Sequence, residues 1–357
     1  MSTNVQVLSG FGHKAPAAIL VSTDQTSSGK TVRILLDAGG SLDHPEQKGW
    51  ELPDDLDAIL ISHDHLDHIQ GLDEVGAEVP VYATHPVQKW LPRHLNIKTL
   101  PLLGEMEIAG VNVTTGQTGH SYGGVWLHLG VAGGVFYSGD ISRESELFAL
   151  TPPPPAHLAL VDASYGLYDE PLASAKAQLK SLLDQPKSLL LPVPQTGRAL
   201  EIAMWLTSQG MTDWTLGHDC LRPRDAFFGP QEAITQQALD ALSAMPSHAF
   251  TPSAKVVLCG NPDGVGGEAE TLLQQLDRYL PVYTGYLPPK AREQVAKGDA
   301  HYIRWNVHPR KSDLKWLITQ LQCRLCVPLF HRLEDAAVWR GELGECITTK
   351  TQFMLPN

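Results

Sequence analysis

The sequence predicts an α/β protein in which one domain is inserted into another. Short apolar runs separated by Gly, Pro and Asp fill the first 165 residues. From about Leu172, helical periodicity alternates with short strands, and after Leu287-Pro288-Pro289 the earlier pattern returns. A chain of 357 residues is long enough for two domains. We therefore expect a host domain at 1–168 and 289–357, with an insertion at 169–288.

The first part of the chain is predicted to be rich in strands. Its apolar runs are short, rich in β-branched residues and bounded by turn formers, which is typical of buried strands. The four prolines at Pro152–Pro155 predict a surface connection between two of them. The predicted strands are Val32–Leu36, Ala58–Ile61, Val79–Ala83, Val111–Thr115, Val125–Leu129, Val135–Tyr137 and Leu158–Val161.

The middle of the chain is predicted to alternate helices with parallel strands. Apolar residues recur there at spacings of three and four, which indicates amphipathic helices between strands. The predicted helices are Ala173–Leu183, Arg198–Ser208 and Gln231–Leu242, and the predicted strands are Ser188–Leu191 and Lys255–Leu258. After the insertion, Asp313–Gln322 predicts a helix with Ser312 as its N-cap, followed by a strand at Leu325–Phe330.

The composition excludes several classes of protein. An apolar fraction of 43% with 18% charged residues is ordinary for a globular protein and excludes a disordered or collagen-like chain. The formal net charge of −12 argues against nucleic-acid binding by bulk attraction. Basic residues nevertheless outnumber acidic ones between Lys290 and Lys350, so an anionic substrate could dock near this segment.

The cysteines and the start of the chain favour a reducing compartment. The chain has five scattered cysteines, which is typical of free thiols. Cys323 and Cys326 fall in an apolar run that predicts a strand, so we expect their side chains on opposite faces as packing residues. No signal peptide opens the sequence, and no apolar run approaches the ~18 residues of a membrane span. We expect a cytoplasmic protein without a membrane partner.

The strongest chemical signal is the segment Ser62-His63-Asp64-His65-Leu66-Asp67-His68, directly after a predicted strand. Imidazole and carboxylate suit zinc and similar divalent ions. His63 and His65 could hold one ion while Asp67 and His68 reach toward a second. Two ions about 3.5–4 Å apart activate water and clamp a phosphoryl or acyl group. A plain polar surface loop is the alternative, and five ligand-type residues in six positions argue against it.

Further ligand-type residues follow other predicted strands. Loops at the ends of adjacent strands cluster in space, so these residues could complete one site at one edge of a sheet. Single acidic residues at such places commonly cap turns, but here the pattern recurs beside small residues. The residues concerned are Asp37, His120, Asp140, Asp162 and His331.

These motifs resemble those of the metallo-β-lactamase superfamily and, more closely, its β-CASP nuclease branch, over nearly the whole chain. Asp37 resembles the first motif, His63-x-His65-x-Asp67-His68 the second, His120 the third and Asp140 the fourth. Asp162, His308 and His331 are similar to motifs A, B and C. Thr196-Gly197-Arg198-Ala199-Leu200-Glu201 and the Gly-rich segment Cys259–Gly267 are similar to stretches of the inserted β-CASP domain. The resemblance implies a metallo-β-lactamase αββα four-layer sandwich with an inserted α/β β-CASP domain.

The resemblance also implies roles for the site residues. His63, His65 and His120 would hold one zinc ion, and Asp67, His68 and His331 a second, with Asp140 bridging them. Mn²⁺ is an expected substitute. Asp37 would orient a ligand histidine. Asp67 is also expected to take part in catalysis, and His308, held by Asp162, would protonate the leaving oxygen.

The activity that the resemblance implies is that of a zinc-dependent nuclease, which hydrolyses phosphodiester bonds with a hydroxide activated by two metal ions. RNA is favoured over DNA because family members with a histidine at motif C tend to prefer RNA. Exonuclease and endonuclease action both stay open, as does a homodimer. A small-molecule metallo-hydrolase and a non-catalytic nucleic-acid-binding scaffold are the alternatives.

Two departures from the family pattern surround the later motifs. Motif B commonly carries an acidic residue soon after its histidine, and here Arg310 stands there. Motif C is usually followed by Gly, and here Arg332 follows His331. Phosphate contacts could come from Ser121, Arg198, Arg310 and Arg332, although a solvated basic face is the competing interpretation.

Overall fold

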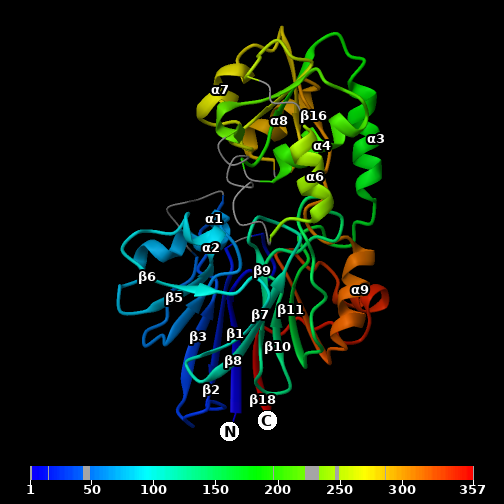
Figure 1. The fold of residues 1–357 in the computed structure, drawn as a ribbon. Helices are drawn as coiled ribbons and strands as arrows, with labels where there is room; N and C mark the ends of the chain where they lie inside the picture. Colours follow the sequence, from blue (N-terminus) through cyan, green and yellow to red (C-terminus); the bar gives the residue numbers. More distant parts are fainter. Residues whose placement is uncertain are drawn as a thin grey trace. The chain divides into compact units, whose positions relative to one another are not determined.

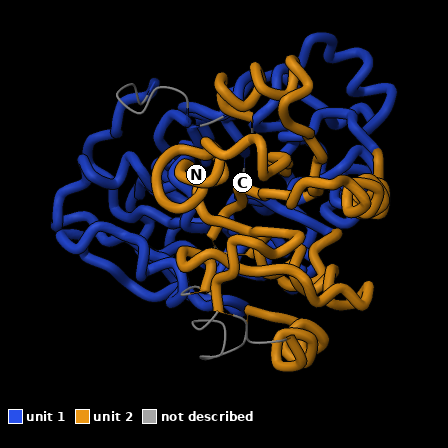
Figure 2. Tube along the Cα trace, turned by 90° about the horizontal axis from the view of Figure 1, so that it is seen from above, with its two compact units in different colours: residues 1–143, 149–169, 307–357 blue, residues 144–148, 170–306 orange. Residues whose placement is uncertain are grey.

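The chain forms two compact units in the computed structural model, which describes residues 2–14, 16–42, 49–195, 197–221, 233–245, 249–285 and 287–356. Unit 1 comprises Met1–Arg143, Ala149–Asp169 and Val307–Asn357. Unit 2 comprises Glu144–Phe148 and Glu170–Asn306 (Figure 2). In sequence, the second unit therefore interrupts the first. Within the described ranges, none of the helices is both apolar enough and long enough to cross a membrane.

The first sheet of unit 1 has seven strands in the order β18-β1-β2-β3-β4-β5-β6. The pairs from β18 to β3 are antiparallel and the pairs from β3 to β6 are parallel. The strands are β1 (Ser2–Ser9), β2 (Ala18–Thr23), β3 (Val32–Leu36), β4 (Ala58–Leu60), β5 (Pro80–Thr84), β6 (Asn96–Leu100) and β18 (Gln352–Pro356).

The second sheet of unit 1 has six strands in the order β17-β11-β10-β9-β8-β7. The parallel neighbours β10, β11 and β17 place three loop starts at one edge of the sheet. The strands are β7 (Gly104–Ile108), β8 (Val111–Gln117), β9 (Val125–Leu129), β10 (Val135–Tyr137), β11 (Leu158–Asp162) and β17 (Leu325–Leu329).

A continuous apolar core fills the space between these two sheets. Ile19, Ile34 and Leu60 of the first sheet pack in one buried cluster with Leu127 and Leu160 of the second. These residues alternate with residues that face outward, because successive side chains of a strand point to opposite faces. Burial of such residues removes their apolar surface from water and holds the sheets together.

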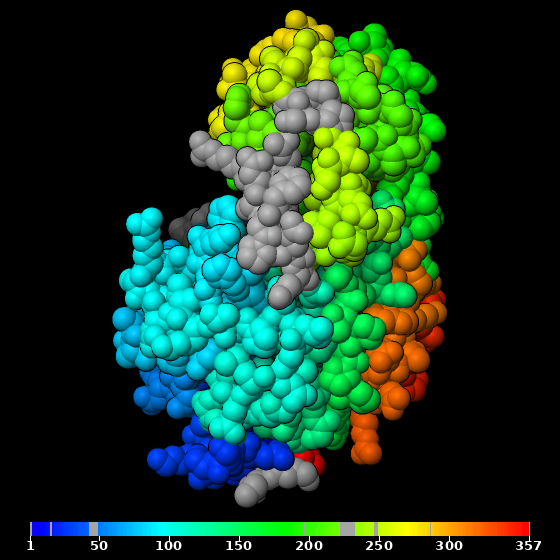
Figure 3. Space-filling model, viewed as in Figure 1, coloured from blue at the N-terminus to red at the C-terminus, as the bar shows by residue number. Residues whose placement is uncertain are grey.

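Helices cover the outer face of each sheet, so the predicted αββα four-layer sandwich is confirmed. On the first sheet, the residues of α1 (Leu66–Ile69), η1 (Gln70–Glu74) and α2 (His85–Gln88) pack in one cluster. On the second sheet, α9 (Lys311–Leu321) and α10 (Ala336–Leu343) pack through another cluster. Figure 1 shows α9, in orange, beside β11, and the orange atoms in Figure 3 lie on the same side of the molecule, next to atoms drawn in green.

Unit 2 is built around a five-stranded parallel sheet in the order β13-β14-β12-β15-β16. Its strands are β12 (Ser188–Pro192), β13 (Trp214–Leu216), β14 (Val256–Cys259), β15 (Tyr279–Tyr283) and β16 (His301–Tyr302). Its helices include α3 (Leu172–Leu182), α4 (Arg198–Ser208), α6 (Gln236–Ala244), α7 (Gly267–Leu273) and α8 (Pro289–Lys297). The helix predicted at 231–242 begins outside the described residues, which resume at residue 233. The described helix starts at Gln236.

Two local predictions near the end of the chain were wrong. The N-cap of α9 is Arg310 rather than Ser312, because Arg310 and Asp313 form a capping box that starts the helix earlier. Cys323 lies before β17 begins at Leu325, so the alternation of a strand does not apply to it. The side chains of Cys323 and Cys326 therefore line the same core, beneath α9 and α10.

Candidate metal centre

The site begins with Asp37, which follows β3 and accepts four hydrogen bonds. Its carboxylate accepts from the Ser62 backbone N–H and hydroxyl at 2.7 Å each, and from the Tyr137 hydroxyl at 2.7 Å. It also accepts from Nδ1 of His68 at 2.7 Å. Asp37 is fully buried and has a φ of 56°, a strained value for a residue with a side chain. It thereby fixes the start of the histidine-rich loop after β4.

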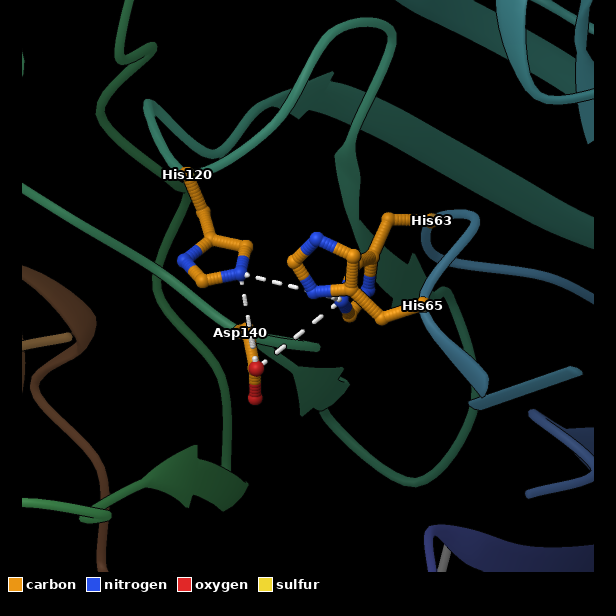
Figure 4. A group of neighbouring side chains, drawn as sticks. All are labelled: His63, His65, His120 and Asp140. Carbon is orange, nitrogen blue, oxygen red and sulfur yellow. Dashed lines mark hydrogen bonds and ion pairs between the residues drawn. The ribbon is translucent and has the colours of Figure 1, made fainter. Parts of the chain in front are cut away.

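Four side chains from three different loops converge in space. His63 and His65 come from the loop after β4, His120 follows β8 and Asp140 follows β10. Their donor atoms all lie within 4.8 Å of one another. Figure 4 shows the three imidazoles and the carboxylate pointing toward a shared centre.

The spacing of these donor atoms fits a tetrahedral ion. Nδ1 of His65 lies 3.0 Å from Nε2 of His63 and 3.2 Å from Nε2 of His120. Oδ2 of Asp140 lies 3.5 Å from Nε2 of His120 and 3.8 Å from Nε2 of His63. Ligand atoms about 2.0–2.1 Å from a tetrahedral zinc ion are separated by about 3.4 Å. The four side chains present therefore fit a zinc-like ion.

A backbone contact sets the tautomer of His120. Nδ1 of His120 donates a hydrogen bond to the carbonyl of Val307. The proton is therefore on Nδ1, which leaves the lone pair of Nε2 directed at the centre.

A second donor set adjoins the first and shares Asp140 with it. Nε2 of His68 lies 3.5 Å from Oδ1 of Asp140 and 3.8 Å from Oδ2 of Asp67. Among the residues that the structure describes, none hydrogen-bonds to Nε2 of His68 or Oδ1 of Asp140, although both atoms are buried. Buried polar atoms are rarely left in this state unless an ion or water satisfies them. These three residues offer part of a second cation site.

Asp140 also lies close to two further residues, Asp162 and His308, which form a hydrogen-bonded pair. Nδ1 of His308 donates to Oδ2 of Asp162 at 2.8 Å and lies 3.7 Å from Oδ2 of Asp140. Asp162 is fully buried at the end of β11. The backbone N–H and hydroxyl of Ser164 donate to its other oxygen at 2.9 and 2.6 Å. The carboxylate therefore holds the imidazole in one orientation.

Burial tunes the histidines of the first set toward metal binding. Burial, with the nearby His68, lowers the pKa of His63 well below its usual value. Burial also lowers the pKa of His65, and lowers that of His120 well below its usual value. The three imidazoles are therefore neutral at pH 7, which is the form that coordinates metal.

Opposing effects act on the charged residues of the centre. Burial favours the neutral acid of Asp140, but Lys14, His308 and His68 hold the pKa of its carboxyl well below the usual value. Burial likewise disfavours the charged form of His68, yet Asp140, Asp67 and Asp37 raise its pKa well above the usual value. Asp140 therefore stays ionised between the two donor sets.

The structure does not bring His331 into either donor set. The ring of His331 lies 5.7 Å from that of Trp339 in α10 and packs against Gly166. Its neighbour Phe330, with a φ of 64°, instead places its ring 5.5 Å from the ring of His68. The left-handed turn at Phe330 thus separates His331 from the other predicted ligands.

Sequence reasoning missed Lys14, whose ammonium lies within the centre. Nζ of Lys14 is 3.7 Å from Oδ2 of Asp67 and 3.8 Å from Oδ2 of Asp140. The only sequence signal was its place in the Gly-rich turn between β1 and β2, which carries no ligand pattern.

The four residues considered for substrate contacts lie in different places. Ser121 is buried one residue after His120, and its hydroxyl has no hydrogen-bond partner among the described residues. Arg310 pairs with Asp313 at the start of α9, and Arg332 is exposed. Arg198, in unit 2, donates to the hydroxyl of Thr284. Ser121 alone of the four is a sequence neighbour of a residue in the first donor set.

Comparison with known proteins gives relatives for part of the chain. Residues 32–201 match the model of the beta-lactamase superfamily domain. The chain is 29% identical to endoribonuclease YSH1 of Candida glabrata over 231 residues, which is 50% of this chain and 29% of that protein. It is 25% identical to transcription termination factor FttA of Methanocaldococcus jannaschii over 258 residues, or 57% of this chain and 39% of that protein. The match thus spans less than half of each relative.

A solved structure agrees over nearly the full chain. A protein of unknown function from Enterococcus faecalis V583 superposes with a TM-score of 0.61 at 14% identity. The match covers 99% of this chain and 100% of that one, and at this identity it speaks for the fold alone. Together with the converging donor atoms, the matched domain and its relatives support the predicted resemblance: the chain is similar to the metallo-β-lactamase superfamily and to proteins of its β-CASP branch.

Proposed function

We propose that the protein is a zinc-dependent nuclease that hydrolyses phosphodiester bonds, with RNA favoured over DNA. The observation that carries this proposal is the convergence of His63, His65, His120 and Asp140 beside a buried Asp162–His308 pair. The same centre offers a second donor set, so we propose two zinc ions, with Mn²⁺ as a substitute. The names of the relatives support RNA as the substrate, since several are endoribonucleases.

Some side chains of the centre would bind the ions, and others orient those ligands. The two donor sets would hold divalent ions, which when bound neutralise charge on the phosphoryl group and lower the pKa of water. Asp140 keeps its negative charge between the two sets, and Asp37 holds His68 with Nε2 directed inward. The protein thus supplies a buried, preorganised site whose ligand side chains need little rearrangement to bind the ions.

His308 is suited to act as the general acid. Its Nδ1 is engaged by Asp162, so Nε2 is the nitrogen that remains to deliver a proton to the leaving oxygen. The imidazole is partly exposed, with 11% of its side chain accessible, whereas Asp162 is inaccessible.

We further propose that unit 2 is the inserted β-CASP domain, which the sequence predicts at residues 169–288. Its parallel sheet, flanked by helices, supports this assignment, although the compact unit continues to Asn306. The resemblance also leads us to propose a homodimer, which light scattering on the purified protein would test.

The decisive experiment incubates the purified, zinc-loaded protein with end-labelled single- and double-stranded RNA and DNA. We expect cleavage of RNA, and product lengths will separate internal from terminal cutting. His65→Ala should abolish cleavage while the fold survives, since it removes one donor of the first set. His85→Ala, at an exposed histidine that starts α2, is the matched control and should cut normally.

Three outcomes would overturn the proposal. Normal cleavage by His65→Ala on every substrate would reject the assigned site. Hydrolysis of a small chromogenic ester without any nucleic-acid cleavage would favour the small-molecule hydrolase, and the absence of bound zinc on elemental analysis would favour the scaffold.

A further inference from the structure

The second donor set contains a positive charge of the protein itself. The ammonium of Lys14 lies within 4 Å of carboxylate oxygens of both Asp67 and Asp140, at 3.7 and 3.8 Å. These two carboxylates, with His68, are the members of the second set. An ammonium at this distance and a divalent ion bound by the same carboxylates repel each other strongly, because the site is shielded from water.

Packing holds Lys14 in this position. Nζ donates to the hydroxyl of Ser164 at 3.1 Å and lies 5.4 Å from the centre of the Phe330 ring. The side chain is 28% exposed, so its stem is largely enclosed. The hydroxyl of Ser164 and the ring of Phe330 therefore hold the ammonium of Lys14 beside the two carboxylates.

The turn that carries Lys14 is fixed against the same phenylalanine. The backbone N–H of Phe330 donates to the carbonyl of Gly10 at 2.6 Å. Gly10 has a φ of 98°, and a Cβ at this position would lie 2.8 Å from the Phe330 ring. Only glycine satisfies both requirements, so the close approach of the turn is built into the sequence.

The ligand that the sequence predicted for this place lies elsewhere. His331 packs against Gly166 and Trp339, whereas Phe330 and Lys14 lie beside His68 and the two carboxylates. The second set therefore offers three donors from the described residues, against four for the first. Fewer donors and a competing ammonium both weaken binding of a second ion relative to the first.

We propose that Lys14 competes with the second divalent ion for Asp67 and Asp140. The two ions then bind with unequal affinity, and the ammonium supplies the second positive charge of the centre while only one ion is bound. This inference rests on the metal centre of the proposed function, but concerns metal binding rather than cleavage.

The test measures zinc binding without nucleic acid. Metal-stripped protein is titrated with zinc against a chromophoric chelator, and the dissociation constants of the first and second equivalents are fitted. Lys14→Met keeps most of the stem and removes the charge. It should tighten the second equivalent at least about tenfold, the effect of about 1.4 kcal/mol, and leave the first nearly unchanged.

Two control variants isolate the charge at this position. Lys14→Arg retains a cation and should keep the second equivalent weak. Lys30→Met removes the same charge from an exposed position in the connection between β2 and β3, and should match the unmodified protein. Thermal unfolding of each metal-free variant checks the fold, and Lys14→Gln repeats the test if Lys14→Met unfolds.

The results separate this inference from the proposed nuclease. Equal affinities for two equivalents in the unmodified protein, or an unchanged second equivalent in folded Lys14→Met, would overturn the role of Lys14. Unequal affinities that converge in Lys14→Met would support it even if the protein cut no nucleic acid, a result that would reject only the nuclease.

Discussion

The imidazole of His308 and the carboxylate of Asp162 form a hydrogen bond of 2.8 Å between Nδ1 and Oδ2. Asp162 in turn accepts from the backbone N–H of Ile141 at 3.3 Å, one residue after the proposed metal ligand Asp140. Asp140 and the partner of the proposed general acid therefore lie at the ends of two neighbouring strands, β10 and β11. A change at His308 should be felt as altered catalysis rather than as lost metal.

We accordingly expect His308→Ala to reduce kcat by about 10²–10⁴-fold, the usual contribution of a positioned acid. Bound zinc should stay unchanged, since His308 has no place in the first donor set. Asp162→Asn should give a smaller loss by weakening the orientation of the imidazole. Single-turnover cleavage with parallel elemental analysis measures both effects. His301→Ala, at an exposed histidine of β16, is the control, and equal rates for His301→Ala and His308→Ala would refute the assigned acid.

A second prediction concerns Asp37, which fixes His68 and the loop after β4. Asp37→Asn replaces one acceptor oxygen by a donor and should weaken zinc binding about 10–100-fold, as is typical when a partner of a ligand histidine is lost. Tyr137→Phe removes one of the four hydrogen bonds and should cost about 1 kcal/mol of unfolding free energy. Chelator competition and urea unfolding measure the two quantities. Asp57→Asn, at an exposed carboxylate that accepts from the Arg33 backbone, is the matched control, and zinc affinity in Asp37→Asn equal to that control would contradict the role.

Glu201 provides a prediction within unit 2. Its buried carboxylate accepts from the Ser145 hydroxyl at 2.6 Å, the Glu146 backbone at 3.0 Å and the Trp305 indole at 3.0 Å. Glu201→Ala would leave these donors without their acceptor, so it should lower the free energy of unfolding by about 2–4 kcal/mol. Urea unfolding followed by tryptophan fluorescence measures the loss. Glu293→Ala, on the surface of α8, should leave the midpoint nearly unchanged, and a similar midpoint for both variants would exclude a structural role for Glu201.

The buried thiols of unit 2 predict instability at alkaline pH. Burial, with the charges of Glu268 and Asp219, raises the pKa of Cys259 to about 12, and burial also raises the pKa of Cys220. A thiol in the unfolded chain loses its proton near pH 9, about three pH units earlier. Above that pH the unfolded chain binds fewer protons than the native protein, so the free energy of unfolding falls as pH rises from about 9 to about 12.

The slope should approach about 1.4 kcal/mol per pH unit for each thiol, while the stability contributed by the thiols stays constant below about pH 8. Urea midpoints measured at successive pH values in Cys259→Ala test this, because this variant should lose part of the slope. A curve for Cys259→Ala parallel to that of the unmodified protein would rule out the thiol as the cause.

The first donor set could be predicted from the sequence because each ligand follows a strand that the apolar pattern identifies. Strands at Val32–Leu36, Val125–Leu129 and Val135–Tyr137 agree with the structure to the residue. His63 follows β4 of the first sheet and Asp140 follows β10 of the second, so strand ends of both packed sheets contribute to the site, rather than one edge of a single sheet. The pattern of buried strands therefore carries the information that positions these ligands.

The rest of the centre depends on backbone conformation that residue patterns do not encode. His331 follows a correctly predicted strand, but the left-handed turn at Phe330 directs the chain so that His331 packs on Trp339. Lys14 reaches the centre through packing of its turn on Phe330, a contact between opposite ends of the chain. Strands such as β1, β6 and β18 were also missed, since their alternating polar residues interrupt the apolar run.

The pairing of β1 with β18 constrains the order in which the protein can assemble. Ser2 lies opposite Pro356, so one side of β1 acquires its neighbour only after the ribosome has added the last described strand. The strands of unit 2 are complete by residue 302, well before that moment. Throughout this interval β1 presents an unpaired edge, which is a site for wrong association with other chains. Nascent molecules stalled before residue 352 should therefore depend on chaperones far more than finished ones.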